Sequence, residues 1–319
     1  MAQKQNRLLF LLVKLAVSSF LLYLVLSKSG FEKVLLILKD ISIPAFIGAM
    51  FLYLFAQFLS TVRWKFFLPH TLGIRKLFSL YLIGSFFNTL LPGIIGGDAV
   101  KGYYLYKATR NGSLALASVF MDRYIGLVVL ITICTLALPF GFGYFQGSRI
   151  AWLVPLIALS FIIASLLIFG LRLGQRVTLI SNFYHYFHAY RNQKHIIAKA
   201  MTLSAIVQLA GILSIYVLAH GFKQDIPFTA LLVFVPLAVL FSTIPISISG
   251  LGVREGAYVV LLGLINIKPE VATAISLSWF LAIVTVSLSG LIEYLRYKRE
   301  TPEDIDFENI TIGKSRNMQ

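Results

Sequence analysis

LLPGIIGGDAVK, residues 90–101, interrupts a long apolar part of this chain with one proline, three glycines and two charged residues. Proline removes a backbone hydrogen-bond donor and glycine weakens a helix, so the backbone is expected to break here. Inside a lipid bilayer, broken backbone is tolerated only where protein buries it or where it lines a hydrated cavity. The stretch therefore predicts an interrupted helix within a membrane domain.

A second stretch with the same design is IPISISGLGVREG, residues 244–256. A proline again ends an apolar run, small residues follow, and a charged pair opens the next run. Paired interruptions of this kind, one in each half of a chain, indicate the binding site of a transporter.

The composition places the chain in the membrane. Of its 319 residues 58% are hydrophobic and only 13% are charged, whereas about a quarter of the residues of a soluble domain are charged. The formal net charge of +15 is spread between apolar runs rather than gathered on a soluble domain. It is therefore explained by basic cytoplasmic loops, and no nucleic-acid partner is expected.

The predicted fold is all-α: a polytopic transmembrane helical bundle of about six full spans. Each interrupted segment is expected to form a re-entrant hairpin, and the two hairpins to enter from opposite sides as an inverted repeat. The first hairpin has a short helix that Asp98 caps and that runs to Thr109. Eight plain spans is the alternative topology. The six spans are predicted at residues 8–26, 43–62, 114–140, 150–171, 198–220 and 271–295.

Basic residues predict the orientation. Most of the 28 lysines and arginines lie in the segments that we assign to the cytoplasm, as the positive-inside rule requires. These segments are the N-terminus, residues 63–76, 101–110 and 172–199, and the C-terminal tail. Both termini are expected there, in a multi-pass protein of the cell inner (plasma) membrane. Residues 172–199 are expected to form an amphipathic helix at the interface. The chain divides into a transmembrane domain, 1–296, and a short polar cytoplasmic tail, 297–319.

Six charged residues lie in or beside the apolar runs: Asp98, Lys101, Asp122, Arg123, Arg254 and Glu255. Each costs about 2.5–3.5 kcal/mol at the centre of a membrane helix, so they should pair or face a hydrated cavity. With the N-termini of the two short helices, the bases are suited to hold a phosphate. The alternative is that these charges only neutralise one another and fix the hairpins in place.

The two stretches, together with Arg63-Trp64 and Asp122-Arg123, resemble the lysylphosphatidylglycerol synthase transmembrane family, which includes stand-alone flippase-like proteins. The resemblance covers nearly the whole chain. It implies movement of a phospholipid or lipid-linked headgroup between leaflets, with a membrane lipid as partner. The expected substrate-binding residues are Arg63, Gly96, Gly97, Asp98, Lys101, Asp122, Arg123, Gly250, Gly252, Arg254 and Glu255.

The sequence offers less support for other functions. Family members that make aminoacyl lipids carry a soluble acyltransferase domain, which is not expected in the short tail here, so catalysis by this chain alone is not predicted. No catalytic residue, cofactor or metal site is expected, and the single cysteine, Cys134, excludes an intrachain disulfide. Two alternatives stay open: a membrane subunit of a lipid-modifying enzyme with a separate transferase partner, and an ion-coupled carrier of a small solute. A homo-oligomer is also possible.

Overall fold

A computed structural model describes residues 2–69, 72–90, 96–145, 148–170, 193–244, 246–247 and 249–300. Those residues form helices and connecting turns with no strand among them, as the predicted all-α fold requires. The helices are α1 (Ala2–Ser29), α2 (Phe31–Lys39), α3 (Ile43–Lys65), α4 (Ile74–Leu90), α5 (Gly96–Thr109), α6 (Gly112–Gly141), α7 (Leu153–Gly170), α9 (Lys194–Gly221), α10 (Phe228–Ser242), α11 (Val253–Gly263) and α12 (Pro269–Glu300), with short 3₁₀ turns η1 (Phe142–Phe145) and η2 (Arg149–Trp152).

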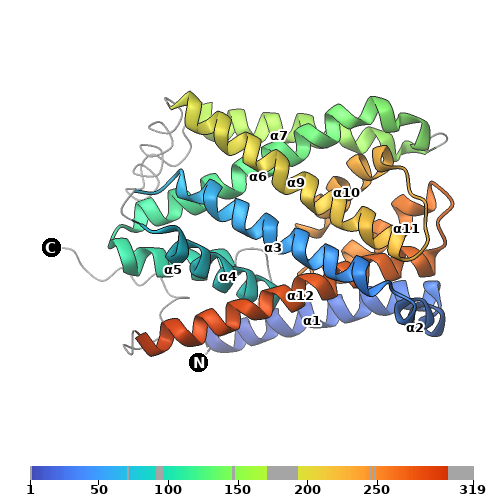
Figure 1. Cartoon of the computed structure of the whole chain (residues 1–319), viewed down its shortest axis with the longest axis horizontal. Coiled ribbons are helices and arrows are strands. Elements are labelled where there is room, and N and C mark those ends of the chain that lie inside the picture. The colour runs from blue at the N-terminus through green and yellow to red at the C-terminus, as the bar shows by residue number, and fades with distance from the viewer. Residues whose placement is uncertain are drawn as a thin grey trace.

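Among the described residues, five helices are long and apolar enough to cross a membrane: α3, α6, α7, α9 and α12. They coincide with five of the six predicted spans. The sixth prediction, residues 8–26, lies within α1, a helix of 28 residues. At 1.5 Å per residue α1 is about 42 Å long, more than the hydrocarbon thickness of about 30 Å. Figure 1 shows these helices running side by side along the long axis of the molecule.

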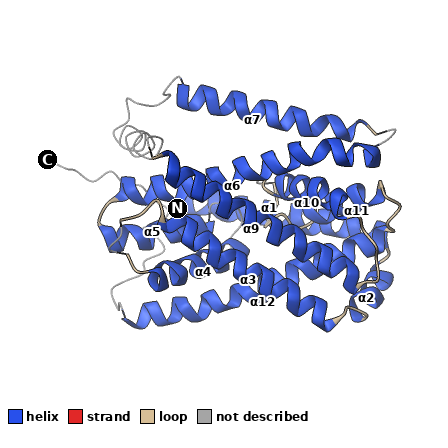
Figure 2. Ribbon diagram, turned by 45° about the horizontal axis from the view of Figure 1, so that its top comes forward, coloured by secondary structure: helices blue, strands red, loops and turns tan. Residues whose placement is uncertain are grey.

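Two pairs of shorter helices stand where the interruptions were predicted. The first pair is α4 and α5, and the second is α10 and α11. In Figures 1 and 2, α4 and α5 lie at one end of the bundle, whereas α10 and α11 lie at the other end. With 11 to 17 residues each, these helices are about 16–26 Å long. Each pair therefore occupies one half of the thickness of the bundle.

The connections also divide between the two ends. The start of α1, the turn from α3 to α4, the turn from α5 to α6 and the end of α12 share the end that carries the first pair (Figure 1). This is the grouping that the distribution of basic residues predicted. The predicted amphipathic helix falls mostly within residues 171–192, which lie outside the described residues. Of the predicted tail, residues 297–300 belong to α12, and 301–319 lie outside the described part of the chain.

Two apolar cores support the two pairs. One core surrounds Trp64 and packs α4 and α5 against α3 and the first half of α6. The other joins α10 and α11 to α9, α12 and the second half of α6, with Phe234 and Tyr258 among its fully buried side chains. The short helices on either side of each interruption are thus packed into a core of their own.

One boundary differs from the prediction. Asp98 was expected to precede the short helix and cap it, but α5 begins at Gly96, which puts Asp98 in the first helical turn. The carboxylate instead pairs with Arg123 of α6, at 2.6 Å. In this ion pair both partners carry a full charge, and the Asp98 side chain is directed toward α6 rather than toward the start of its own helix.

Candidate functional site

Asp122 of α6 is the centre of a buried group of charges. Its Oδ1 accepts a hydrogen bond from Nε of Arg63 at 2.9 Å, and its Oδ2 lies 3.2 Å from Nζ of Lys101. The phenol of Tyr81 donates to Oδ2 at 3.0 Å. Asp122 is fully buried, and Arg63 and Lys101 are at least 95% buried. These contacts join α3, α4, α5 and α6 at one point, so the carboxylate ties the first helix pair to the spans around it.

Aromatic and hydroxyl groups complete the environment of the two cations. Nζ of Lys101 lies 4.5 Å from the ring centroid of Trp64 and 4.2 Å from that of Tyr81, a distance at which an ammonium is attracted to an aromatic face. Arg63 donates a further hydrogen bond to Ser204 of α9. Both cations are therefore held by more than their ion pairs, as burial in a membrane protein requires.

Asp98 and Arg123 form a second, more exposed ion pair beside the first. Nε of Arg123 donates to Oδ2 of Asp98 at 2.6 Å, and Nζ of Lys101 lies 3.8 Å from Oδ1 of the same carboxylate. The Arg123 side chain is 49% exposed, whereas that of Asp98 is 13% exposed. Arg123 is thus the more exposed partner of this ion pair.

We call the residues Arg63, Asp98, Lys101, Asp122 and Arg123 the α5–α6 charge cluster. It contains three cations and two carboxylates, which leaves one positive charge in excess. An excess positive charge within a low-dielectric region attracts anions strongly. The half-exposed cation of the cluster is the one best placed to bind an anion.

Arg254 and Glu255 belong to a different cluster. Nη2 of Arg254 lies 2.6 Å from Oε1 of Glu255, and Ser276 of α12 donates to the same oxygen at 3.2 Å. The other oxygen, Oε2, accepts from the backbone N–H of Gly252 at 2.6 Å, which caps α11 at its first turn. The Arg254 guanidinium also lies over the ring of Phe280. This cluster is neutral and its carboxylate is fully buried.

The predicted seat, in which Arg254, Lys101 and Arg123 hold one phosphate, is therefore not assembled. The structure brings Lys101 of α5 and Arg123 of α6 together at Asp98, but places Arg254 on α11, against α12. Each of the two carboxylates pairs with a nearby base: Asp98 pairs with Arg123, and Glu255 pairs with Arg254.

The predicted glycines serve close packing. A Cβ atom on Gly97 would lie 2.7 Å from the backbone nitrogen of Asn88 and closer still to the carbonyl of Gly84, so α5 touches the backbone of α4. Gly252 has a φ of +82° and would bring a Cβ within 2.8 Å of the backbone nitrogen of Leu22 on α1. Gly250 has a φ of +75°, and a Cβ atom there would lie 2.7 Å from the Cβ atom of Ser242. Gly96 is partly buried at the start of α5.

The two interruptions meet inside the bundle. The hydroxyl of Ser249 donates to the carbonyl oxygen of Asn88 at 2.8 Å and lies 3.1 Å from that of Thr89. The Asn88 side chain in turn accepts from the backbone N–H of Gly97 at 2.9 Å. Ser249 of the second interruption thus bonds to carbonyl groups at the end of α4, and the Asn88 side chain of α4 bonds to a backbone N–H at the start of α5. These are backbone groups that have no partner within their own helices.

The sequence analysis missed Tyr81, Ser85 and Asn88, which form a polar row on α4. Ser85 bonds to Ser287 of α12 at 3.0 Å and accepts from Gln57 of α3 at 3.1 Å. The signal was present in the spacing, because residues separated by four and then three positions lie on one helix face. In an apolar helix, a polar row of this kind marks the side that faces other helices.

Comparison with known proteins identifies the family of this chain. The family model described as the lysylphosphatidylglycerol synthase TM region matches residues 11–290. The chain belongs to this family. The match to the lysylphosphatidylglycerol synthase TM region family covers both interruptions and all five residues of the α5–α6 charge cluster.

Curated relatives are archaeal membrane proteins. A UPF0104 membrane protein of Methanocaldococcus jannaschii is 24% identical over 90% of this chain and 95% of its own length. One of Methanothermobacter thermautotrophicus is 25% identical over 63% of this chain and 69% of its own length. One of Pyrococcus horikoshii is 29% identical over 40% of this chain and 39% of its own length. No solved structure matches.

Proposed function

We propose that this multi-pass membrane protein is a flippase-like lipid transporter, which moves a phospholipid or lipid-linked headgroup between the two leaflets. The observation that carries the proposal is the α5–α6 charge cluster, with its excess positive charge and its half-exposed Arg123. Ionisable residues within membrane helices are costly and typically mark the path of a substrate or ion. An anionic headgroup is the partner that this charge favours.

Arg123 is the proposed headgroup contact, and the other members of the cluster position it. Asp98 holds Nε of Arg123 at 2.6 Å, and we propose that the terminal nitrogens of the guanidinium bind the phosphate in a bidentate manner. Lys101 and Arg63 are buried on Asp122. They raise the local positive potential without exposing themselves to lipid.

The proposed topology follows from the arrangement of the helix pairs. We propose that α4 and α5 enter and leave the membrane from the cytoplasmic side of the plasma membrane, and that α10 and α11 do so from the opposite side. Both termini then lie in the cytoplasm. The contact between Ser249 and the end of α4 supports a meeting of the two pairs near the midplane, where transporters of this architecture bind their substrates.

The test is translocation of head-labelled phospholipids in liposomes that contain the purified protein. Wild type is expected to move phosphatidylglycerol, and Arg123→Gln to slow it about tenfold, the loss expected for one charge-assisted contact of about 1.4 kcal/mol. Arg296→Gln is the matched control, because Arg296 is a 70% exposed cation at the end of α12. A folded wild-type protein that moves no anionic lipid contradicts the proposal, and so does an equal effect of the two substitutions.

A further inference from the structure

Asp98 and Glu255 occupy the same position in the two short helices that follow the interruptions. Each is the third residue of its helix, because α5 begins at Gly96 and α11 begins at Val253. Each carboxylate also pairs with an arginine, at 2.6 Å in both cases. A carboxylate at this position commonly accepts a hydrogen bond from a backbone N–H at the start of its own helix, and Glu255 does so from Gly252 at 2.6 Å.

Asp98 has a different arrangement, in which both of its oxygens face cations. Its Oδ2 accepts from Nε of Arg123 at 2.6 Å, and its Oδ1 lies 3.8 Å from Nζ of Lys101. Only 13% of the Asp98 side chain is exposed, compared with 49% of that of Arg123. Asp98 therefore covers one side of the cation that the proposed function assigns to the headgroup phosphate.

A phosphate on the terminal nitrogens of Arg123 would be a second anion on a guanidinium that Asp98 already holds. Two anions this close repel each other, most strongly where protein and lipid exclude water. The start of α5 offers the displaced carboxylate another position, because the first N–H groups of a helix have no partner within it and its dipole favours a negative charge there. Glu255 shows this arrangement at the start of α11.

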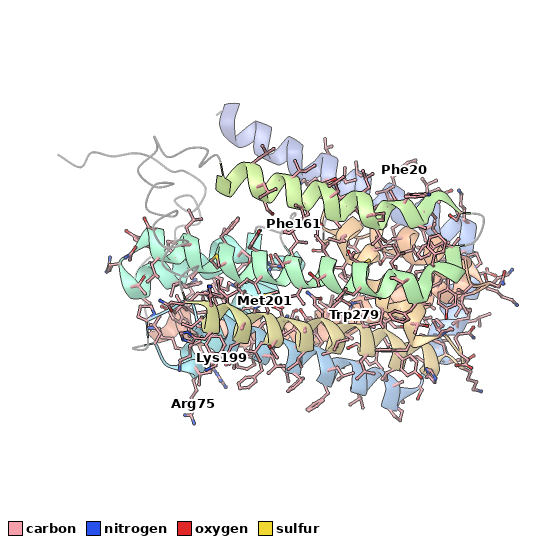
Figure 3. The ribbon with its side chains drawn as sticks, turned by 90° about the horizontal axis from the view of Figure 1, so that it is seen from above. Phe20, Arg75, Phe161, Lys199, Met201 and Trp279 are labelled. Atoms are coloured by element: carbon pink, nitrogen blue, oxygen red, sulfur yellow. The ribbon has the colours of Figure 1, made fainter. Side chains whose placement is uncertain are left out.

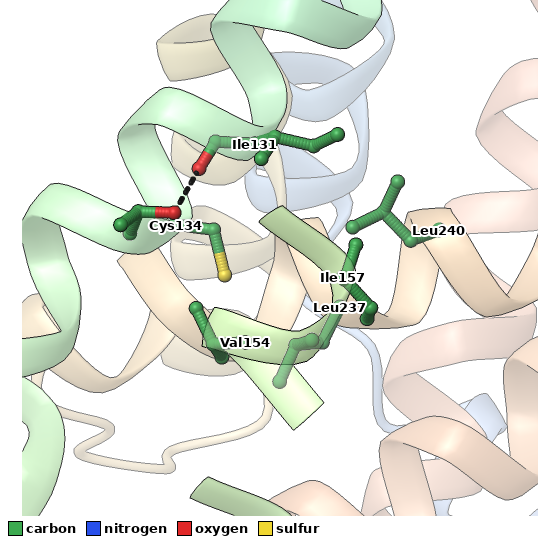
Figure 4. A pocket seen from close by; sticks show the side chains of 7 residues that line it. Ile131, Cys134, Val154, Ile157, Leu237 and Leu240 are labelled. Carbon is green, nitrogen blue, oxygen red and sulfur yellow. Dashed lines mark hydrogen bonds between the residues drawn. The ribbon is translucent and has the colours of Figure 1, made fainter. Parts of the chain in front are cut away.

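The surroundings of Arg123 make the departure of Asp98 depend on a new anion. The next residue, Tyr124, stacks on Phe161 of α7 at 5.7 Å between ring centroids (Figure 3). Farther along, α6 packs against α7 and α10 through mainly apolar side chains (Figure 4). Asp122, the carboxylate that precedes Arg123 on α6, is engaged by two other cations. An Arg123 that lost Asp98 without gaining an anion would thus be a costly charge among apolar groups.

We infer that Asp98 is an internal competitor of the anionic headgroup at Arg123. Before a headgroup binds, Asp98 holds the guanidinium; when a phosphate binds, Asp98 moves to the start of α5; and when the phosphate leaves, Asp98 returns. The inference rests on the proposed function and adds how the headgroup is released. A competitor within the protein weakens binding in proportion to the time for which it occupies the cation, and a more weakly bound lipid dissociates faster.

The test measures the Kd of dihexanoyl phosphatidylglycerol, a soluble short-chain lipid, for the full-length protein in detergent by titration calorimetry. Asp98→Asn removes the competing charge and is expected to lower Kd about tenfold. The same variant is expected to slow translocation about threefold or more in liposomes, because release of the lipid becomes slower. Asp98→Glu keeps the charge and is expected to stay within about threefold of wild type in both measurements.

Two controls separate competition at Arg123 from a general effect of charge. Glu293→Gln removes the carboxylate partner of another arginine, Arg296, at 3.2 Å, and is expected to leave Kd unchanged. In an Arg123→Gln background, Asp98→Asn is expected to change Kd less than about twofold, because the cation for which Asp98 competes is gone. Asp98→Ser also lacks the charge and suits a helix start, so it serves if Asp98→Asn does not fold.

Translocation by the same preparations distinguishes the two proposals. A wild-type protein that moves lipid, with an uncharged residue 98 that binds no more tightly, keeps the proposed function and overturns the internal competitor. A gain in affinity that persists without Arg123 overturns it as well. A wild-type protein that moves no lipid, with Asp98→Asn binding more tightly through Arg123, keeps the competitor and contradicts the transport function.

Discussion

The hydroxyl of Ser249 lies 2.8 Å from the carbonyl oxygen of Asn88, 161 positions away in the chain. Ser249 belongs to the second interruption, and Asn88 lies in the last turn of α4, next to the first. A displacement of one interruption must therefore stretch or break a bond to the other. The two helix pairs are joined at the C-terminal end of α4.

Ser249→Ala tests this joint. The substitution removes a donor to the carbonyls of Asn88 and Thr89, and we expect it to cost about 1 kcal/mol of unfolding free energy and to change the rate of lipid translocation. Ser289→Ala is the control, since its hydroxyl donates to the carbonyl oxygen of Val286 within the same helix, α12. Equal behaviour of the two variants in thermal unfolding and in translocation would show that the joint has no role.

Asp122→Asn tests the centre of the charge cluster. The change leaves Arg63 and Lys101 buried without their carboxylate, which is expected to cost about 3–5 kcal/mol. Glu293→Gln, which removes the partner of the exposed Arg296, is expected to cost about 1 kcal/mol or less. The unfolding free energies of both variants are measured in detergent. A loss of unfolding free energy for Asp122→Asn as small as that for Glu293→Gln would refute a central role for Asp122.

Gly97→Ala tests the close approach of α4 and α5. A methyl group there would overlap the backbone of Gly84 and Asn88, so we expect a loss of about 1–3 kcal/mol from overpacking. Gly211→Ala on α9 is the matched control, because no atom lies within 4 Å of its added Cβ. Alanine has the higher helix propensity, and the control should be neutral or stabilising. A neutral Gly97→Ala would mean that the two helices lie farther apart.

Arg254 and Glu255 are suited to a double-mutant cycle. Removing either partner leaves the other buried, so Arg254→Met and Glu255→Gln should each destabilise the protein, while the double variant loses less than the sum by about 0.5–3 kcal/mol. The cycle is measured by unfolding in detergent. Headgroup selectivity should stay that of wild type in every folded variant. A change in selectivity at Arg254 would instead assign this cluster to substrate binding.

Much of the fold could be predicted from the sequence because membrane insertion imposes few solutions. Apolar runs of about 20 residues gave the spans, and each proline-glycine interruption appears where the paired short helices are found. The grouping of chain ends also follows from the basic residues. These features depend on local composition, which a single sequence contains.

The site was only partly predictable because partners are chosen by packing between distant helices. The sequence shows that Asp122 and Lys101 need partners, but nothing local indicates that Arg63 and Tyr81 meet the same carboxylate, 59 and 41 positions away. Likewise, the sequence alone does not distinguish Arg254 from the other basic residues in the apolar runs. Its neighbour Glu255 and Ser276 of α12 satisfy it, which only the packing of α11 on α12 reveals.

The unequal numbers of cations and carboxylates in the α5–α6 charge cluster have an electrical consequence. The empty cluster carries one net positive charge, and a phospholipid headgroup with a single negative charge brings the total to zero. The transmembrane voltage does work on a net charge, about 2.3 kcal/mol for one charge crossing 100 mV. In a transporter of this kind, the membrane potential acts on the unloaded form and leaves the loaded form nearly unaffected, so voltage sets the return of the empty site rather than the passage of the lipid.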